Sequence, residues 1–119
     1  MTGVQTCALP IYSTRSVDPR RAHDLIIELV EKNPGEITIL GIGPLTNVAL
    51  AFLKAPSIAP QIKNIVLMGG AIHYPGNTTP QSEYNVFCDP EAYDIVLRSG
   101  IDITLVPLDV TYKIGRAHV

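Results

Sequence analysis

The stretch with the greatest capacity for chemistry is the polar segment GNTTPQSEYN, residues 76–85, which follows the apolar run IVLMGG. It places two amides, Asn77 and Asn85, close to a carboxylate, Glu83. A carboxylate accepts hydrogen bonds, whereas an amide both donates and accepts them, so the three side chains could hold a ligand rich in hydrogen-bonding groups. The alternative is that they are ordinary solvated loop residues, and the residue types by themselves leave both readings open.

Composition narrows the class of ligand and partner. A net charge of −2 offers no basic surface for nucleic acid, so we expect a small neutral or metal-bridged ligand. With 46% hydrophobic and 17% charged residues, the chain is predicted to form one modest domain with a buried core. No stretch is long and apolar enough to span a bilayer, so we expect no membrane partner.

Both ends of the chain look foreign to its middle. Residues 6–11, TCALPI, can be encoded by DNA whose reverse complement, read one base in, encodes IGRAHV, which is residues 114–119. We therefore expect residues 1–11 and 114–119 to be translated sequencing adapter, and residues 12–113 to be a partial native domain. Cys88 is then the one native cysteine, which fits a reducing, cytoplasmic compartment.

Three helices are expected, two of them with clear start signals. Asp18 and Pro19 suit a helix start, because aspartate accepts from free first-turn amides and proline loses no bond there. Asp89 and Pro90 repeat that signal, and Glu91 adds a negative charge in the first turn. A helix cap and a first-turn charge explain Asp89 and Glu91 better than a catalytic pair of acids does. The apolar faces predicted for the three helices are Ala22, Leu25, Ile26, Leu29 and Val30; Leu45, Val48, Ala49 and Phe52; and Ala92, Ile95, Val96 and Leu97.

Each of these helices is expected to be followed by an apolar strand, at residues 36–42, 62–70 and 101–110. Residues 36–42 are apolar almost throughout, which predicts a strand covered on both faces. Strands that alternate with helices predict an α/β fold with an open, mostly parallel sheet, right-handed crossovers and flanking helices. Ligands of such sheets bind beyond the carboxyl ends of the strands, so the polar loop is expected on that rim. The strand ends that meet there are residues 41–43, 68–70 and 107–109.

Four consecutive segments resemble one family. GPLTNVALA, IVLMGGA, GNTTPQSEYNVFCDPEA and ITLVPLDVT are similar to motifs of the inosine-uridine-preferring nucleoside hydrolases, in that family's order and spacing. The resemblance implies a Rossmann-like nucleoside hydrolase core, here incomplete. It also implies an enzyme that splits the N-ribosidic bond of a nucleoside with a calcium-activated water, and a parent enzyme that is a homo-oligomer.

The resemblance also implies roles for individual residues. Asn77, Glu83 and Asn85 match the ribose-binding residues of the family, and Met68 matches the methionine under the sugar. Ile42 matches the position whose main-chain carbonyl ligates calcium, a cation that prefers oxygen. Tyr84 stands where the family usually has phenylalanine, and Ser82 where alanine is common.

Other parts of the family's site have no counterpart in this sequence. The N-terminal aspartate cluster, which supplies the general base, and the C-terminal His-Asp pair are both absent from residues 12–113. We therefore expect this polypeptide alone to be inactive and to bind calcium weakly or not at all. We expect it also to aggregate in isolation, because its outer strands would expose edges and apolar faces.

Two further classes of protein remain as alternatives. One is a ribose- or nucleoside-binding module without chemistry, and the other is a generic piece of α/β scaffold. Among single residues, His73 is expected to be a simple loop histidine, and Asp109 to have a structural role. Cys88 precedes a helix start, where a thiolate would be favoured, but His23 and His73 are not obviously near enough to make a catalytic pair.

Overall fold

The computed structural model describes residues 16–114 of the chain. The adapter prediction for residues 1–11 lies outside this range, as do residues 115–119 of the second adapter segment. Ile114 is the last described residue and ends a helix.

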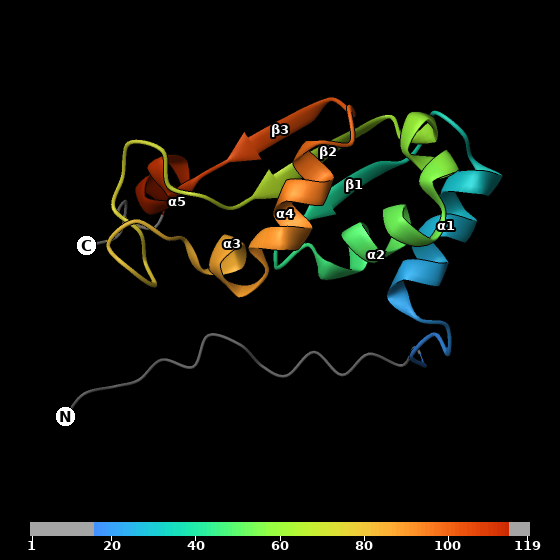
Figure 1. Cartoon of the computed structure of the whole chain (residues 1–119), viewed down its shortest axis with the longest axis horizontal. Helices are drawn as coiled ribbons and strands as arrows, with labels where there is room; N and C mark the ends of the chain where they lie inside the picture. The colour runs from blue at the N-terminus through green and yellow to red at the C-terminus, as the bar shows by residue number, and fades with distance from the viewer. Residues whose placement is uncertain (1–15, 115–119) are drawn as a thin grey trace.

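The sheet of the described part is open and parallel, as predicted. It contains β1 (Thr38–Gly41), β2 (Asn64–Met68) and β3 (Ile103–Val106) in the order β1-β2-β3 (Figure 1). Thr38 pairs with Asn64 at one end of β1, and Gly41 pairs with Leu67 at the other. On the far side of β2, Met68 pairs with Val106. The carboxyl ends of the three strands therefore lie on one rim.

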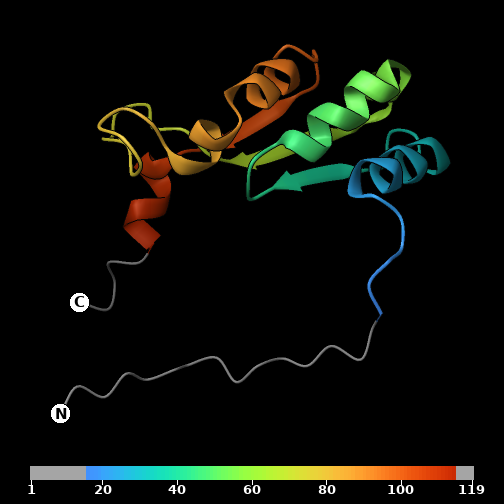
Figure 2. The same cartoon turned by 60° about the horizontal axis from the view of Figure 1, so that its bottom comes forward.

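Helices α2 and α4 cover one face of the sheet (Figure 2). The helical elements in chain order are α1 (Ala22–Lys32), α2 (Thr46–Lys54), the 3-10 helix η1 (Pro56–Gln61), α3 (Tyr84–Cys88), α4 (Pro90–Leu97) and α5 (Leu108–Ile114). The core between the sheet and the helices centres on side chains that are fully buried, among them Val30, Leu45, Ile65, Leu67 and Val96.

The predicted apolar faces are only partly right. All four residues predicted for α2 are buried. In α4 the prediction that Leu97 belongs to the buried face is wrong, because Leu97 is 52% exposed, and Tyr93 is buried instead. In α1 Val30 is buried and Ile26 packs against the core, but Ala22 and Leu29 are exposed.

The predicted burial of residues 36–42 on both faces is wrong for the described structure. Ile39 packs against the core, whereas Leu40 is 66% exposed and Ile42 is 74% exposed. Successive side chains of a strand point to opposite faces, so one face of β1 is covered and the other is open. The apolar residues of β1 suit a strand that is covered on both faces, but residues 16–114 cover only the face that carries Ile39.

The two predicted helix starts also differ in outcome. Asp89 caps α4 as expected, and accepts a hydrogen bond from the amide of Ala92 at 3.0 Å. Asp18 does not cap α1, which begins only at Ala22. Its carboxylate instead binds the guanidinium and the amide of Arg20. None of the helices found in residues 16–114 is both long and apolar enough to cross a membrane.

Candidate functional site

Glu83 is the most deeply buried charged side chain at the rim, with 2% of its surface exposed. It is the N-cap of α3, and its Oε1 accepts from the amide of Asn85 at 2.9 Å. Its Oε2 accepts from the amides of Gly70 at 3.0 Å and Val86 at 3.2 Å. The carboxylate therefore satisfies free amides at the start of α3 and ties this helix to the turn that follows β2.

Asn85, 8% exposed, is held against the last residue of β2. Its Nδ2 donates to the main-chain carbonyl of Met68 at 3.1 Å and lies 3.3 Å from the sulfur of the same residue. Because a carbonyl can only accept, the amide nitrogen of Asn85 must be the atom that faces it. The Oδ1 atom of Asn85 is then the acceptor that remains for a ligand.

Asn77 is exposed, and its amide oxygen is the engaged atom, whereas in Asn85 the amide nitrogen is engaged. Its Oδ1 accepts from the amide of Tyr84 at 2.8 Å, so its Nδ2 remains as a donor. The loop around it is closed by its own backbone, because the carbonyl of Ser82 accepts from the amides of Asn77 at 3.1 Å and Thr78 at 3.1 Å. Gly76 is required for this closure, since a Cβ there would lie 2.3 Å from the carbonyl oxygen of Thr79.

The structure thus brings Met68, Asn77, Glu83 and Asn85 together at the carboxyl end of β2. Ile42 follows Gly41, which pairs with Leu67, so its main chain lies on the same rim. The loop and residue 42 therefore lie on the same rim of the sheet, as the alternation of strands and helices predicted.

The described residues do not form a cation site by themselves. No group of three or more histidine, cysteine, aspartate or glutamate side chains within residues 16–114 is placed to hold a metal. Calcium takes roughly six to eight oxygen ligands, and the carbonyl of Ile42 could supply one of them. The donor set present here therefore does not fit a complete calcium site.

Asp109 has the structural role that was expected of it. Its carboxylate accepts from the amides of Ile72 at 3.0 Å and His73 at 2.7 Å, which joins the start of α5 to the segment after β2. The hydrogen bond from Ile72 is the main reason why the pKa of Asp109 is lowered, and the bond from His73 acts in the same direction. Sequence reasoning placed Asp109 at the rim but could not name these partners, because they lie 36 and 37 residues away.

Sequence reasoning missed two residues: Tyr93, which joins α4 to the site, and Thr46, which joins α2 to α4. The hydroxyl of Tyr93 donates to the carbonyl of Met68 at 3.2 Å, and the hydroxyl of Thr46 donates to Asp89. Tyr93 carried a usable signal, because with Ala92 and Val96 it has the spacing of a helix face. Thr46 carried a weaker one, as the first residue of α2 in GPLTN.

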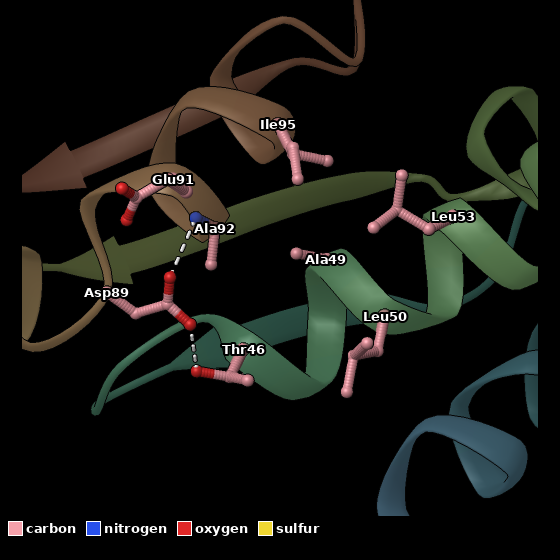
Figure 3. Close-up of a pocket in the computed structure, with 8 residues that line it drawn as sticks. All are labelled: Thr46, Ala49, Leu50, Leu53, Asp89, Glu91, Ala92 and Ile95. Carbon is pink, nitrogen blue, oxygen red and sulfur yellow. Dashed lines mark hydrogen bonds between the residues drawn. The ribbon is translucent and has the colours of Figure 1, made fainter.

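A cavity of about 390 Å³ adjoins the candidate site, because Glu83 lines it together with Gly70, Ser82 and Phe87 among others. Met68, Asn77 and Asn85 do not line this cavity. A second cavity, of about 160 Å³, lies between α2 and α4 and is mostly apolar (Figure 3). None of the four predicted sugar-binding residues lines that second cavity.

Comparison with known proteins identifies the family of this chain. The model of the family described as "Inosine-uridine preferring nucleoside hydrolase" matches residues 1–119. Uridine nucleosidase 1 of Arabidopsis thaliana is 44% identical over 112 residues, which are 94% of this chain and 33% of the relative.

Two solved structures share the fold at comparable identity. The plant nucleoside hydrolase PpNRh1 superposes with a TM-score of 0.82 at 40% identity, over 87% of this chain and 33% of its own. The purine-preferring ribonucleoside hydrolase of Gardnerella vaginalis gives a TM-score of 0.80 at 42% identity, over 85% of this chain and 32% of its own. The chain spans about a third of the length of these relatives. With a family match over all its residues, the chain belongs to the inosine-uridine preferring nucleoside hydrolase family.

Proposed function

We propose that this chain carries the ribose-binding part of an enzyme that hydrolyses the N-glycosidic bond of ribonucleosides to ribose and free base. The observation that supports this most directly is the grouping of Met68, Asn77, Glu83 and Asn85 at the carboxyl end of β2. These four residues are the ones that match the family's sugar-binding positions.

The hydrogen bonds of the two amides support a site for a polyhydroxyl ligand. The Oδ1 atom of Asn77 is engaged by Tyr84, and its Nδ2 has no acceptor within residues 16–114. The Nδ2 atom of Asn85 is engaged by Met68, and its Oδ1 has no donor in the same part of the chain. A sugar hydroxyl both donates and accepts, so neighbouring hydroxyls of one ribose could use both atoms. Glu83 keeps an acceptor position on Oε1, which has a single amide partner among the described residues.

This arrangement serves the chemistry of N-glycosidic cleavage. The bond breaks through an oxocarbenium-like sugar, so the enzyme must hold the sugar firmly while positive charge builds on it. Amides fixed by the backbone hold it without reorganising during the reaction, and the Glu83 carboxylate adds negative charge near the sugar. We propose that the resident cation of the complete enzyme is calcium, with the Ile42 carbonyl as one ligand.

The ribose, and not the base, is the part of the substrate that this segment is proposed to recognise. Relatives that share the segment have names that differ in the base, because one is a uridine nucleosidase and another is a purine-preferring ribonucleoside hydrolase. A reducing, cytoplasmic compartment and a homo-oligomeric parent enzyme stay predictions from the sequence.

Titration with D-ribose, followed by ¹H–¹⁵N NMR of the chain, tests the site. We expect saturable shifts of the amides of Gly70, Tyr84 and Asn85. The variant Asn77→Asp keeps the oxygen that binds Tyr84 but loses the donor, so it should weaken binding about threefold to tenfold. Asn64→Asp, at the opposite end of β2, is the matched control and should bind like the parent. Equal binding by both variants, or shifts that never saturate, would overturn the proposed site.

A separate measurement addresses catalysis. We expect the purified chain to release no base from inosine or uridine with added calcium, because its described residues supply neither a cation site nor a general base. Detectable base release would refute that expectation.

A further inference from the structure

We propose that Tyr93 is a positioning residue of this site, and that it acts through the main-chain carbonyl of Met68. The inference rests on the proposed ribose site and adds a residue to it. Tyr93 lies on α4, and 4% of its surface is exposed.

The carbonyl of Met68 is shared by two side chains. The Tyr93 hydroxyl donates to it at 3.2 Å, and Nδ2 of Asn85 donates to it at 3.1 Å. A carbonyl oxygen has two lone pairs, so these two donors complete its hydrogen bonding. Tyr93 therefore fixes the oxygen against which the Asn85 amide is oriented.

Gly69 provides independent evidence that this contact is built into the structure. A Cβ at Gly69 would lie 1.9 Å from the Tyr93 hydroxyl oxygen and 2.8 Å from its Cζ. The phenol thus fills the space that the absence of a side chain leaves beside β2. The same Cβ position is 3.3 Å from Oε2 of Glu83, so Tyr93 also lies close to the buried carboxylate.

These contacts predict what the hydroxyl contributes. Without it, the Met68 carbonyl loses one of its two partners and the peptide that carries it is free to tilt. The Asn85 amide would follow, and its Oδ1 would no longer be held in one place for a sugar hydroxyl. Because Tyr93 is buried behind this peptide, its effect on the sugar is indirect.

The variant Tyr93→Phe tests the proposal, since it removes the hydroxyl and keeps the ring. Tyr112→Phe is the matched control, because Tyr112 lies on α5 and its ring centroid is 5.0 Å from that of Tyr74, with the two rings tilted by 35°. In the ligand-free chain, we expect the side-chain NH₂ resonances of Asn85 to shift and exchange faster in Tyr93→Phe alone. The D-ribose dissociation constant should rise about threefold to tenfold in the same variant.

Gly69→Ala is a second variant that displaces the phenol from the opposite side, and it should move the same Asn85 resonances. Unchanged Asn85 resonances in Tyr93→Phe would overturn the positioning role. If the parent chain binds no ribose, the proposed function fails, but the ligand-free Asn85 resonances still decide whether Tyr93 positions this amide.

Discussion

The hydroxyl of Thr46 donates a hydrogen bond to Asp89, a residue 43 positions further along the chain (Figure 3). Thr46 is the first residue of α2, and Asp89 is the N-cap of α4. One carboxylate thus accepts from the first turn of its own helix and from the start of the neighbouring helix. The bond from Thr46 is the main cause that lowers the pKa of Asp89. This hydrogen bond links the start of α2, in GPLTN, to the start of α4, in CDPEA.

Thr46→Val should therefore destabilise the fold without changing the shape of the side chain. Loss of one hydrogen bond is expected to lower the free energy of unfolding by about 1 kcal/mol, measured by urea denaturation. Thr104→Val, on the exposed side of β3, is the control and should change it much less. A double-mutant cycle with Asp89→Ala should show coupling, and additive losses would contradict the link.

Replacement of Glu83 should cost more than loss of a surface charge. Glu83→Gln keeps one acceptor oxygen but turns an NH₂ group toward a backbone amide, so we expect a loss of about 2 to 3 kcal/mol. Glu91→Gln, in the exposed first turn of α4, should be nearly neutral in the same urea experiment. Equal stability of the two variants would mean that the three hydrogen bonds from backbone amides to Glu83 contribute little to the free energy of unfolding. Because Glu83 shapes the site, its removal alone cannot separate folding from sugar binding, which is why Asn77→Asp is the sharper probe of function.

The Asp109 carboxylate should make the fold sensitive to acid. Its folded pKa lies below its ordinary value of 3.8, so its contribution to stability is complete above that value and is lost as the pH falls through the folded pKa. The free energy of unfolding of Asp109→Asn should accordingly fall less than that of the parent between pH 5 and pH 3. Asp102→Asn, at an exposed site before β3, is the control for the aspartate-to-asparagine substitution itself. Parallel pH curves for Asp109→Asn and the parent would contradict the prediction.

The phenol of Tyr93 should make the stability of the fold sensitive to alkali, whereas Asp109 makes it sensitive to acid. Burial, and in addition the nearby charge of Glu83, raise the pKa of Tyr93 to about 12 from its ordinary value of 10.0. The neutral phenol therefore stabilises the fold fully below pH 10, and this contribution is lost as the pH rises toward 12. Alkaline denaturation should be shallower in Tyr93→Phe than in the parent chain, and tyrosinate absorbance in Tyr93→Phe should lack the group with a pKa of about 12. Identical alkaline curves would refute this assignment.

Gly76 should tolerate no side chain, because a Cβ there would lie 2.4 Å from the amide nitrogen of Ser82 and 2.3 Å from the carbonyl oxygen of Thr79. Gly76→Ala is expected to open the loop and abolish the ribose-induced shift of the Tyr84 amide. Gly43→Ala, where a Cβ meets nothing within 4 Å, is the control for the cost of adding a methyl group. A ribose response in Gly76→Ala equal to that of the control would show that loop closure is not needed.

The sequence alone determined the alternation of α1, α2 and α4 with three parallel strands, and the rim on which the polar loop lies. It did not predict η1, α3 or α5, and the strand expected to reach residue 110 is wrong at its end, because β3 stops at Val106 and α5 begins at Leu108. Apolar periodicity and the Asp89-Pro90 start act over a few residues, so they can be seen without a fold. The position of Ile42 on the same rim as the loop also followed from the parallel alternation of strands and helices.

Only the tertiary structure decided how the rim is held together. Glu83 reaches Gly70 across 13 residues, Asn85 reaches Met68 across 17, and Tyr93 reaches the same carbonyl across 25. Hydrogen bonds over such separations depend on how strands and helices pack, and no local pattern encodes them. Packing also explains why the expected cover of β1 was wrong, because its second face is open in the described part of the chain. The error at Asp18 has a local cause, since its carboxylate binds Arg20 two residues away and does not cap α1.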